Sequence, residues 1–198
     1  MIYSYEGLLE KYSNYATPKM KIKREVEQGR LFIIKPGLYV DDKNVSKYSL
    51  AHIIYGPSYI SFETALSYYG IIPERAEKVM CATTQKNKIK LYKNLFGEYL
   101  YRDVPNMAFP YGIETESVNS ENIIRIASPE KALLDTLYTI KNVDSLRRLK
   151  ILLFEDMRID EDSLIKMNKQ FIEEVGPLYK KRNIDLLIKL LGVICKTH

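Results

Sequence analysis

Apolar residues recur at three- and four-residue spacing in one stretch near the middle of the chain, and this pattern predicts its central helix. The stretch is Ser128-Pro129-Glu130-Lys131-Ala132-Leu133-Leu134-Asp135-Thr136-Leu137. Ser128 is suited to cap the first turn with its hydroxyl, and Pro129 fits the first helical position because it has no N–H to leave unpaired. The leucines that follow form one buried face. The strand-like run at 122–127 leads directly into this helix, so the pattern predicts a helix packed on a sheet.

Two short helices and a β-hairpin are predicted at the N-terminal end. The helices span about residues 5–12 and 18–28, and a residue suited to capping precedes each of them. Strands at 30–34 and 38–40 follow, joined by the turn tripeptide Lys35-Pro36-Gly37. This order predicts a winged helix-turn-helix, in which the second helix enters the major groove of DNA and the hairpin rests on the backbone.

The second of these helices is expected to carry apolar residues on its inward side and basic residues outside. Met20, Ile22 and Val26 form the predicted inward side. Between Lys19 and Lys35 the chain has six basic residues and two acidic ones, an excess that suits contacts with DNA phosphates. A solvated basic face is the alternative. Because charge, helix placement and hairpin agree, we favour insertion of this helix into a major groove.

Alternating patterns predict a sheet in the middle of the chain. The expected strands lie at 78–83, 89–92, 97–104, 112–118 and 122–126. A helix from Ser61 to Tyr69 precedes them, with Ser61 as its cap and Gly70 at its end. Placing the central helix on an antiparallel sheet gives an α+β fold.

Leucine and isoleucine at helical spacing predict three further helices after residue 142. They lie at 145–154, 162–174 and 178–195. One face of the last helix is apolar, so this helix must pack on the rest of the chain or on another chain. We therefore divide the chain into a winged helix-turn-helix domain at 1–47, an α+β domain at 48–142 and a helical C-terminal extension packed on it at 143–198.

Composition indicates a globular chain. Its 198 residues, 46% of them hydrophobic, supply a sizeable core. It has no run of about 18 apolar residues and no signal-peptide pattern, so we expect a cytoplasmic protein without membrane contact. Cys81 and Cys195 form no metal-ligand spacing with His52 or His198 and are expected to be buried free thiols. The net charge of +5 arises from basic ends around a nearly neutral middle, which favours nucleic acid only weakly.

Patterns that match enzyme motifs lack the context that the chemistry needs. Ser128 and Lys131 fit the S-x-x-K motif of penicillin-binding proteins and serine β-lactamases, and residues 117–119 supply an S-x-N. Their order is reversed and no K-T-G strand follows. His52 has no nucleophile near it in sequence, and no glycine motif for phosphate binding is present. We therefore expect no catalytic residues, cofactor, metal or small-molecule substrate.

Tyrosine is abundant, with 16 residues, and its aromatic rings can stack on nucleic-acid bases. Most of them stand at inward or strand positions, so core packing is the default interpretation. The candidates for stacking are those near the basic helix, Tyr3, Tyr5, Tyr12 and Tyr15.

Three motifs in one order carry a resemblance to a known family. They are G-R-L-F-I-I-K-P-G-L-Y-V at 29–40, Y-I-S-F-E-T-A-L at 59–66 and I-A-S-P-E-K-A-L-L-D at 126–135. Over about residues 3–140 the chain resembles the AbiEi family of antitoxins and transcriptional regulators of type IV toxin-antitoxin systems, which act in abortive infection of phage-infected cells.

The resemblance implies a DNA-binding autoregulator with a winged domain that represses its own operon at double-stranded operator DNA. It also implies that the second domain opposes a cognate nucleotidyltransferase-like toxin. The DNA-binding residues that it implies here are Lys19, Lys21, Lys23 and Arg24 on the helix, and Arg30, Lys35 and Gly37 in the wing. Lysine mostly contacts phosphates, whereas arginine usually reads bases.

A different class of function is also open. The chain can be a protein-interaction module that keeps the wing without binding DNA and uses its leucine-rich C-terminal helices for contact. This alternative predicts an exposed apolar patch on residues 178–195 that is larger than the few hundred Å² usual for monomers.

Overall fold

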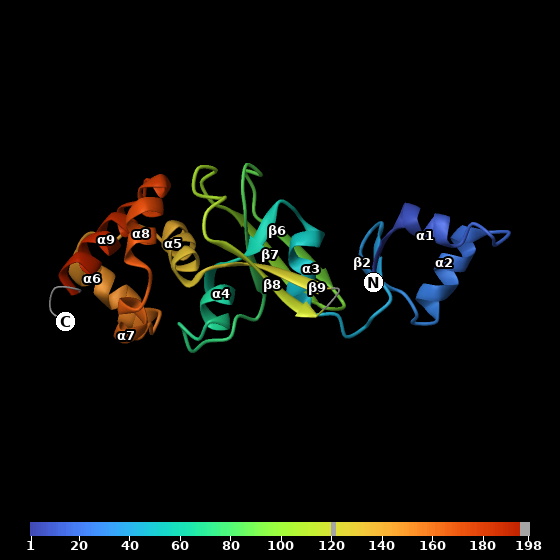
Figure 1. Cartoon of the computed structure of the whole chain (residues 1–198), viewed down its shortest axis with the longest axis horizontal. Helices are drawn as coiled ribbons and strands as arrows, with labels where there is room; N and C mark the ends of the chain where they lie inside the picture. Colours follow the sequence, from blue (N-terminus) through green and yellow to red (C-terminus); the bar gives the residue numbers. More distant parts are fainter. Residues whose placement is uncertain (120–121, 195–198) are drawn as a thin grey trace.

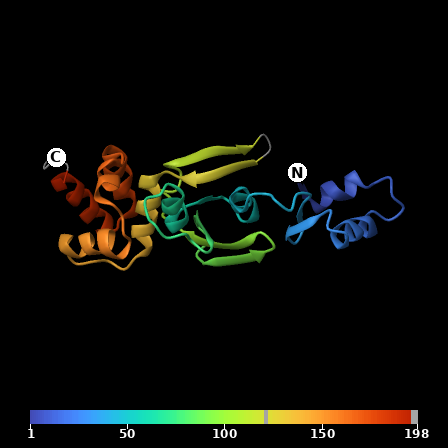
Figure 2. The same ribbon diagram turned by 90° about the horizontal axis from the view of Figure 1, so that it is seen from below.

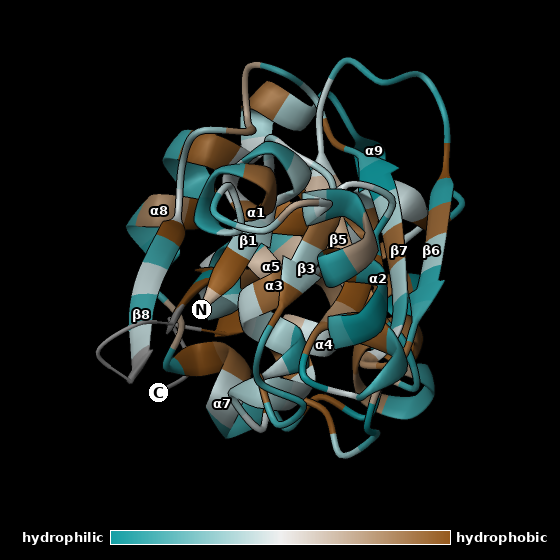
Figure 3. Cartoon of the chain, turned by 90° about the vertical axis from the view of Figure 1, so that its right-hand side faces the viewer, coloured by the Kyte–Doolittle hydropathy of each residue, from teal (hydrophilic) through white to brown (hydrophobic). Residues whose placement is uncertain are grey.

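The computed structural model describes residues 1–119 and 122–194, except for the side chains of 118–122. Its elements form a mixed α+β structure with two sheets. Figure 1 shows three parts in a row: an N-terminal module at one end, a larger sheet in the middle and a group of helices at the other end. Hydrophobic segments gather toward the interior, whereas β6 at the edge of the sheet is mostly hydrophilic (Figure 3).

The N-terminal module contains two helices and a small sheet. Its elements are β1 (Ile2–Ser4), α1 (Tyr5–Lys11), α2 (Pro18–Glu27), β2 (Phe32–Lys35) and β3 (Leu38–Val40). The helices and the hairpin confirm the predicted elements, and Ser4 caps α1 by accepting a hydrogen bond from the backbone N–H of Gly7 at 3.0 Å. Strand β1 was not predicted; it pairs with β3 and makes the sheet three-stranded, in the order β1-β3-β2.

A small core of its own holds this module together. Leu8, Ile22 and Leu31 are buried in it, so the inward position of Ile22 is confirmed. The prediction for Met20 is wrong, because its side chain is 46% exposed. Met20 lies two residues before Ile22, so about 200° of helical turn separates it from the buried face.

The middle part is a six-stranded sheet with three helices. Its elements are α3 (Lys47–Ile54), β4 (Ser58–Ile60), α4 (Phe62–Tyr68), β5 (Val79–Thr83), β6 (Lys90–Asn94), β7 (Gly97–Asp103), β8 (Ile113–Asn119), β9 (Asn122–Ala127) and α5 (Pro129–Thr139). The strand order is β6-β7-β5-β4-β9-β8. Figure 2 shows the hairpins β6–β7 and β8–β9 as two arms on either side of α3.

The predicted antiparallel sheet is wrong, because the sheet is mixed. β4 pairs with β9 and β5 pairs with β7 in parallel, and the other pairings are antiparallel. The tight turns of the two hairpins set only the pairing within each hairpin. The second strand of each hairpin then joins the sheet beside an earlier strand that is not its hairpin partner, β7 beside β5 and β9 beside β4. Parallel neighbours need such connections, which are longer than a hairpin turn.

The helices of the C-terminal part cover the end of the middle part. They are α6 (Leu146–Lys150), which continues into the π-helical turn Ile151–Asp156, then α7 (Glu161–Ile165), α8 (Lys169–Val175), the 3-10 turn Gly176–Tyr179 and α9 (Arg182–Ile194). The single helix predicted at 162–174 is two helices, because Asn168 interrupts it. Its side chain caps α8 by accepting a hydrogen bond from the N–H of Phe171 at 3.0 Å.

The leucine-rich face of α9 packs on its own chain. Ile184, Leu187, Leu190 and Leu191 are all buried. Val193, 57% exposed, is the one strongly exposed large apolar side chain among the described residues of this helix. The apolar patch that the protein-interaction alternative requires is therefore absent from residues 178–194. Cys195 and His198 lie outside the described residues, and Cys81 is a buried free thiol as predicted.

A buried polar network joins the central helix α5 to the sheet and to the C-terminal helices. Lys131 and Asp135 have no solvent exposure, and the Lys131 ammonium donates to the Asp135 carboxylate at 3.0 Å. Tyr179 donates to the same carboxylate at 2.5 Å, and Tyr59 from β4 donates to it at 2.9 Å. Helix α5, strand β4 and the C-terminal part thus each donate a hydrogen bond to one carboxylate.

Ser128 and Ser61 were both predicted to cap helices, but only Ser128 makes a capping hydrogen bond. Ser128 caps α5 as predicted, accepting a hydrogen bond from the N–H of Lys131 at 3.3 Å. Ser61 stands at the N-cap of α4 but makes no capping bond. Its hydroxyl donates instead to the buried Asp135 carboxylate at 2.6 Å, a hydrogen bond strengthened by the charge of the acceptor.

Candidate nucleic-acid interface

Helix α2 presents its basic residues on the side away from the small core. It begins at Pro18, which suits the first turn. Ile22 faces the core, while Lys19, Lys23 and Arg24 are exposed and Lys21 is half-buried. Arg24 makes no ion pair with any residue in the part of the chain that the structure describes. The exposed face of α2 is therefore positively charged.

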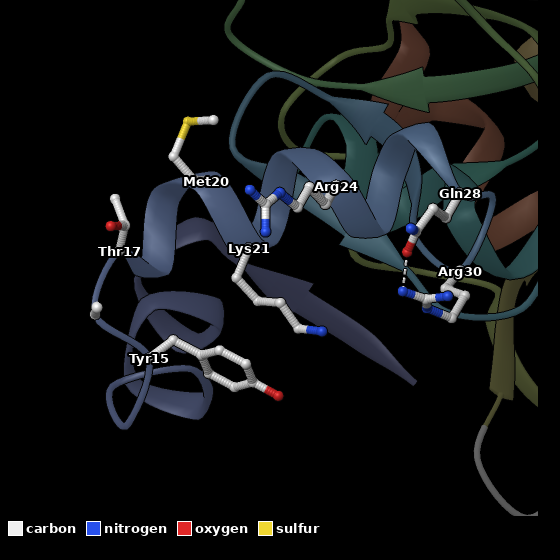
Figure 4. Close-up of a pocket in the computed structure, with 8 residues that line it drawn as sticks. Tyr15, Thr17, Met20, Lys21, Arg24, Gln28 and Arg30 are labelled. Carbon is white, nitrogen blue, oxygen red and sulfur yellow. Dashed lines mark hydrogen bonds between the residues drawn. The ribbon is translucent and has the colours of Figure 1, made fainter.

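A hollow of about 460 Å³ lies beside this helix. Its lining residues are Tyr15, Ala16, Thr17, Met20, Lys21, Arg24, Gln28 and Arg30. Figure 4 shows Lys21 and Arg24 leaving α2, Tyr15 across from Lys21, and Arg30 at the far end of the helix, bonded to Gln28. The hollow thus brings together three of the seven residues predicted to bind DNA.

A buried carboxylate under the hollow holds two of these cations. Glu25 accepts from the Lys21 ammonium at 2.6 Å and from Arg30 Nε at 2.6 Å. A second Arg30 nitrogen lies 2.8 Å from the other carboxylate oxygen, so the arginine contact is bidentate. Hydrogen bonds from Arg30 and then Lys21 lower the pKa of Glu25 to about 2. The same contacts raise the pKa values of Lys21 and Arg30, so both stay protonated at neutral pH.

Sequence reasoning did not single out Glu25. The signal was present as the spacing of Lys21 and Glu25, four residues apart on a helix, which brings the two side chains together. The arginine beyond the end of the helix carries no such periodic signal, because it reaches Glu25 only once the chain has turned at Gly29.

Of the four tyrosines predicted to be able to stack on bases, Tyr15 lines the hollow and Tyr12 packs against Tyr15, whereas Tyr3 and Tyr5 are not among the lining residues. The Tyr12 and Tyr15 rings lie edge to face with 5.8 Å between their centroids. The Lys21 ammonium lies 4.9 Å from the centroid of Tyr15 and 5.8 Å from that of Tyr12. Tyr15 remains 51% exposed, so part of its ring is accessible from solvent.

The remaining predicted residues lie away from the hollow. Lys23 is exposed and stands 3.8 Å from Glu27, a weak surface pair. Lys35 is half-buried, and its ammonium donates to the carbonyl of Ile54 at 2.6 Å, at the end of α3. It therefore attaches the hairpin to the middle part. Gly37 is exposed with a φ of +81°, which the turn requires and a side chain would disfavour.

The groups that suggested enzyme chemistry are engaged in packing. The Ser128 hydroxyl donates to Glu130 at 2.9 Å, and the Lys131 ammonium donates to the Ala108 carbonyl at 2.9 Å. Burial lowers the pKa of Lys131, and the Asp135 carboxylate opposes that shift. His52 is half-buried, and burial together with the nearby charge of Arg125 lowers its pKa.

Acidification is expected to destabilise the N-terminal module through Glu25. The folded pKa of about 2 lies below the ordinary value of 4.5, so the carboxylate contributes its full stabilisation above about pH 4.5 and loses it as the pH falls toward 2. After allowance for solvent screening of the exposed Arg30, we expect a loss of about 2 kcal/mol. Urea unfolding of the wild type and of Glu25→Gln between pH 7 and pH 3 measures it.

The Glu25→Gln variant is the control for all other acidic groups. Its unfolding free energy should be lower than that of the wild type at pH 7, and the difference should shrink steadily as the pH falls from about 4.5 to 3. A constant difference across this pH range would contradict the role given to Glu25.

Two kinds of feature are absent from the described residues, 1–119 and 122–194. No helix there is both long enough and apolar enough to cross a membrane. No group of three or more His, Cys, Asp and Glu side chains gathers there to hold a metal ion. In comparisons with protein-family models and with curated proteins, no match to this chain is found.

Proposed function

We propose that the N-terminal module is a winged helix-turn-helix and that the protein is a DNA-binding transcriptional autoregulator. The observation that carries the proposal is the exposed basic face of α2, where Lys19, Lys23 and Arg24 point away from the core. The hairpin β2–β3 follows α2 directly and is held in place by Lys35. A helix of this width fits the major groove, and a neighbouring hairpin then lies along the phosphate backbone.

The second half of the proposal concerns the rest of the chain. The three motifs that resemble the AbiEi family support the role of an antitoxin that opposes a nucleotidyltransferase-like toxin. Two of these motifs supply the buried network, since Tyr59 and Ser61 come from one and Lys131 and Asp135 from the other. We propose that this network gives the middle part the fixed shape on which the antitoxin role depends.

Fluorescence anisotropy with labelled duplex DNA tests the proposed regulator. We expect the protein to bind DNA from its own upstream region about 1,000-fold more tightly than scrambled DNA of equal length, a ratio within the range of specific regulators. Each phosphate contact should add about 0.9 to the slope of log affinity against log salt concentration. Equal, weak binding to both duplexes would contradict the proposal.

A further inference from the structure

The hollow beside α2 has a high local density of positive charge. Three cations line it, and the nearest carboxylate, Glu25, is buried beneath them and shared by two of the three. Arg24 remains without an ion pair in the described part of the chain. An anion that entered the hollow would therefore meet the Arg24 guanidinium and two further cations already held in place.

Two large side chains with exposed apolar surface also line the hollow. Tyr15 and Met20 are 51% and 46% exposed, although both are large apolar side chains. An aromatic face next to cations is the usual means of binding a nucleotide, because the ring stacks on the base while the cations hold the phosphate. A volume of about 460 Å³ exceeds that of a phosphate and is enough for a sugar-phosphate unit.

We propose that this hollow binds one nucleotide unit. The phosphate lies between Arg24, Lys21 and Arg30, and the sugar and base lie against Tyr15 and Met20. The nucleotide is either a unit of the bound DNA, in which case the inference rests on the proposed function, or a free nucleotide. Both sources offer a sugar-phosphate to the hollow, but the base of a duplex stays paired, so only a free nucleotide also stacks on Tyr15. The experiment separates the two.

The methionine methyl groups provide a local probe. The protein has six methionines, and Met20 lies at the hollow. In full-length protein with ¹³C-methyl methionine, its resonance can be assigned with Met20→Leu. We expect thymidine 5′-monophosphate to shift the Met20 signal with a dissociation constant of about 1 mM, a weak single-site affinity. Thymidine, which lacks the phosphate, should leave it unchanged at the same concentration.

Two variants test whether the Arg24 guanidinium contributes to nucleotide binding. Arg24→Ala should weaken binding of thymidine 5′-monophosphate at least about tenfold, because it removes a charge-assisted contact. This side chain is exposed and forms no ion pair with the described residues, so the fold is retained. Lys150→Ala on α6 removes an exposed cation elsewhere and should leave the titration unchanged. An unmoved Met20 signal up to about 10 mM nucleotide, or an equal effect of both variants, would overturn the proposal.

A second titration with duplex DNA from the upstream region separates this inference from the proposed function. A Met20 shift with both duplex and nucleotide supports a DNA-strand source. A shift with the nucleotide alone supports the hollow as a site for free nucleotides, and anisotropy then decides separately whether the duplex binds. Duplex binding detected by anisotropy, with no Met20 shift from either the duplex or the nucleotide, would leave the regulator proposal standing and overturn the nucleotide site.

Discussion

Replacing Asp135 by asparagine is expected to lower the free energy of unfolding by about 3–5 kcal/mol, the usual consequence of breaking a buried ion pair from one side. Lys131 has no solvent exposure, and its ammonium depends on the Asp135 carboxylate 3.0 Å away. Tyr59, Ser61 and Tyr179 also donate to this carboxylate. An amide accepts fewer hydrogen bonds and carries no charge, so it leaves these donors and the ammonium poorly matched. Urea unfolding at pH 7 measures the loss.

Two control variants make this expectation specific. The double variant Lys131→Met/Asp135→Leu removes both charges and should be less destabilised than Asp135→Asn, because no unpaired ammonium remains buried. Glu173→Gln breaks the exposed pair of Lys169 and Glu173 on α8, whose nitrogen and oxygen lie 3.6 Å apart. That change should cost less than about 0.5 kcal/mol. A loss below about 1 kcal/mol for Asp135→Asn would show that the buried charge is not held by this carboxylate.

The network also shows why local patterns predicted part of the fold and missed the rest. Ser4 and Ser128 were predicted as caps and act as caps, because a cap interacts with the N–H groups of the residues that directly follow it. Ser61 has the same local pattern and does something else, because Asp135, 74 residues later, lies within reach of its hydroxyl. Sequence spacing carries no information on such a contact.

The unpredicted strands have the same physical explanation. β1 and β4 contain three residues each, too few for alternation to be visible, and they exist because other strands pair with them. The three residues of β4 are all buried, which is common for a central strand and removes the polar positions that mark a surface strand. β4 also accounts for one of the two parallel pairings, the one with β9.

The candidate interface was predicted in its charge but not in its geometry. The basic excess of α2 was visible in the sequence, and the exposed positions of Lys19, Lys23 and Arg24 agree with it. The hollow could not be predicted from the sequence. Two of its cations are positioned by contacts with Glu25, and one of them, Arg30, lies beyond the end of the helix, where helical spacing no longer applies. Lys35 belongs to the same basic run, and tertiary packing turned its ammonium toward the backbone of α3.

Removing the exposed charge of α2 is expected to have the largest effect on DNA binding. The triple variant Lys19→Ala/Lys23→Ala/Arg24→Ala should weaken binding to the upstream duplex at least about 100-fold at low salt, because alanine can no longer reach the phosphates or bases that these three side chains bind. The slope of log affinity against log salt concentration should fall by about 0.9 for each phosphate that the variant no longer neutralises. Stability should change little, because alanine favours the helix and the three side chains are exposed.

A matched variant at the other end of the molecule decides whether position or only charge matters. Arg147→Ala/Arg148→Ala/Lys150→Ala removes the same number of exposed positive charges from α6, which lies at the end opposite α2 (Figure 1). The Debye length at physiological salt is about 8 Å, so these distant charges act weakly on DNA bound at α2. We expect an affinity change of less than about threefold for this control. If both triple variants lost affinity equally, general attraction between a basic protein and DNA would explain the binding, and α2 would not be the recognition helix.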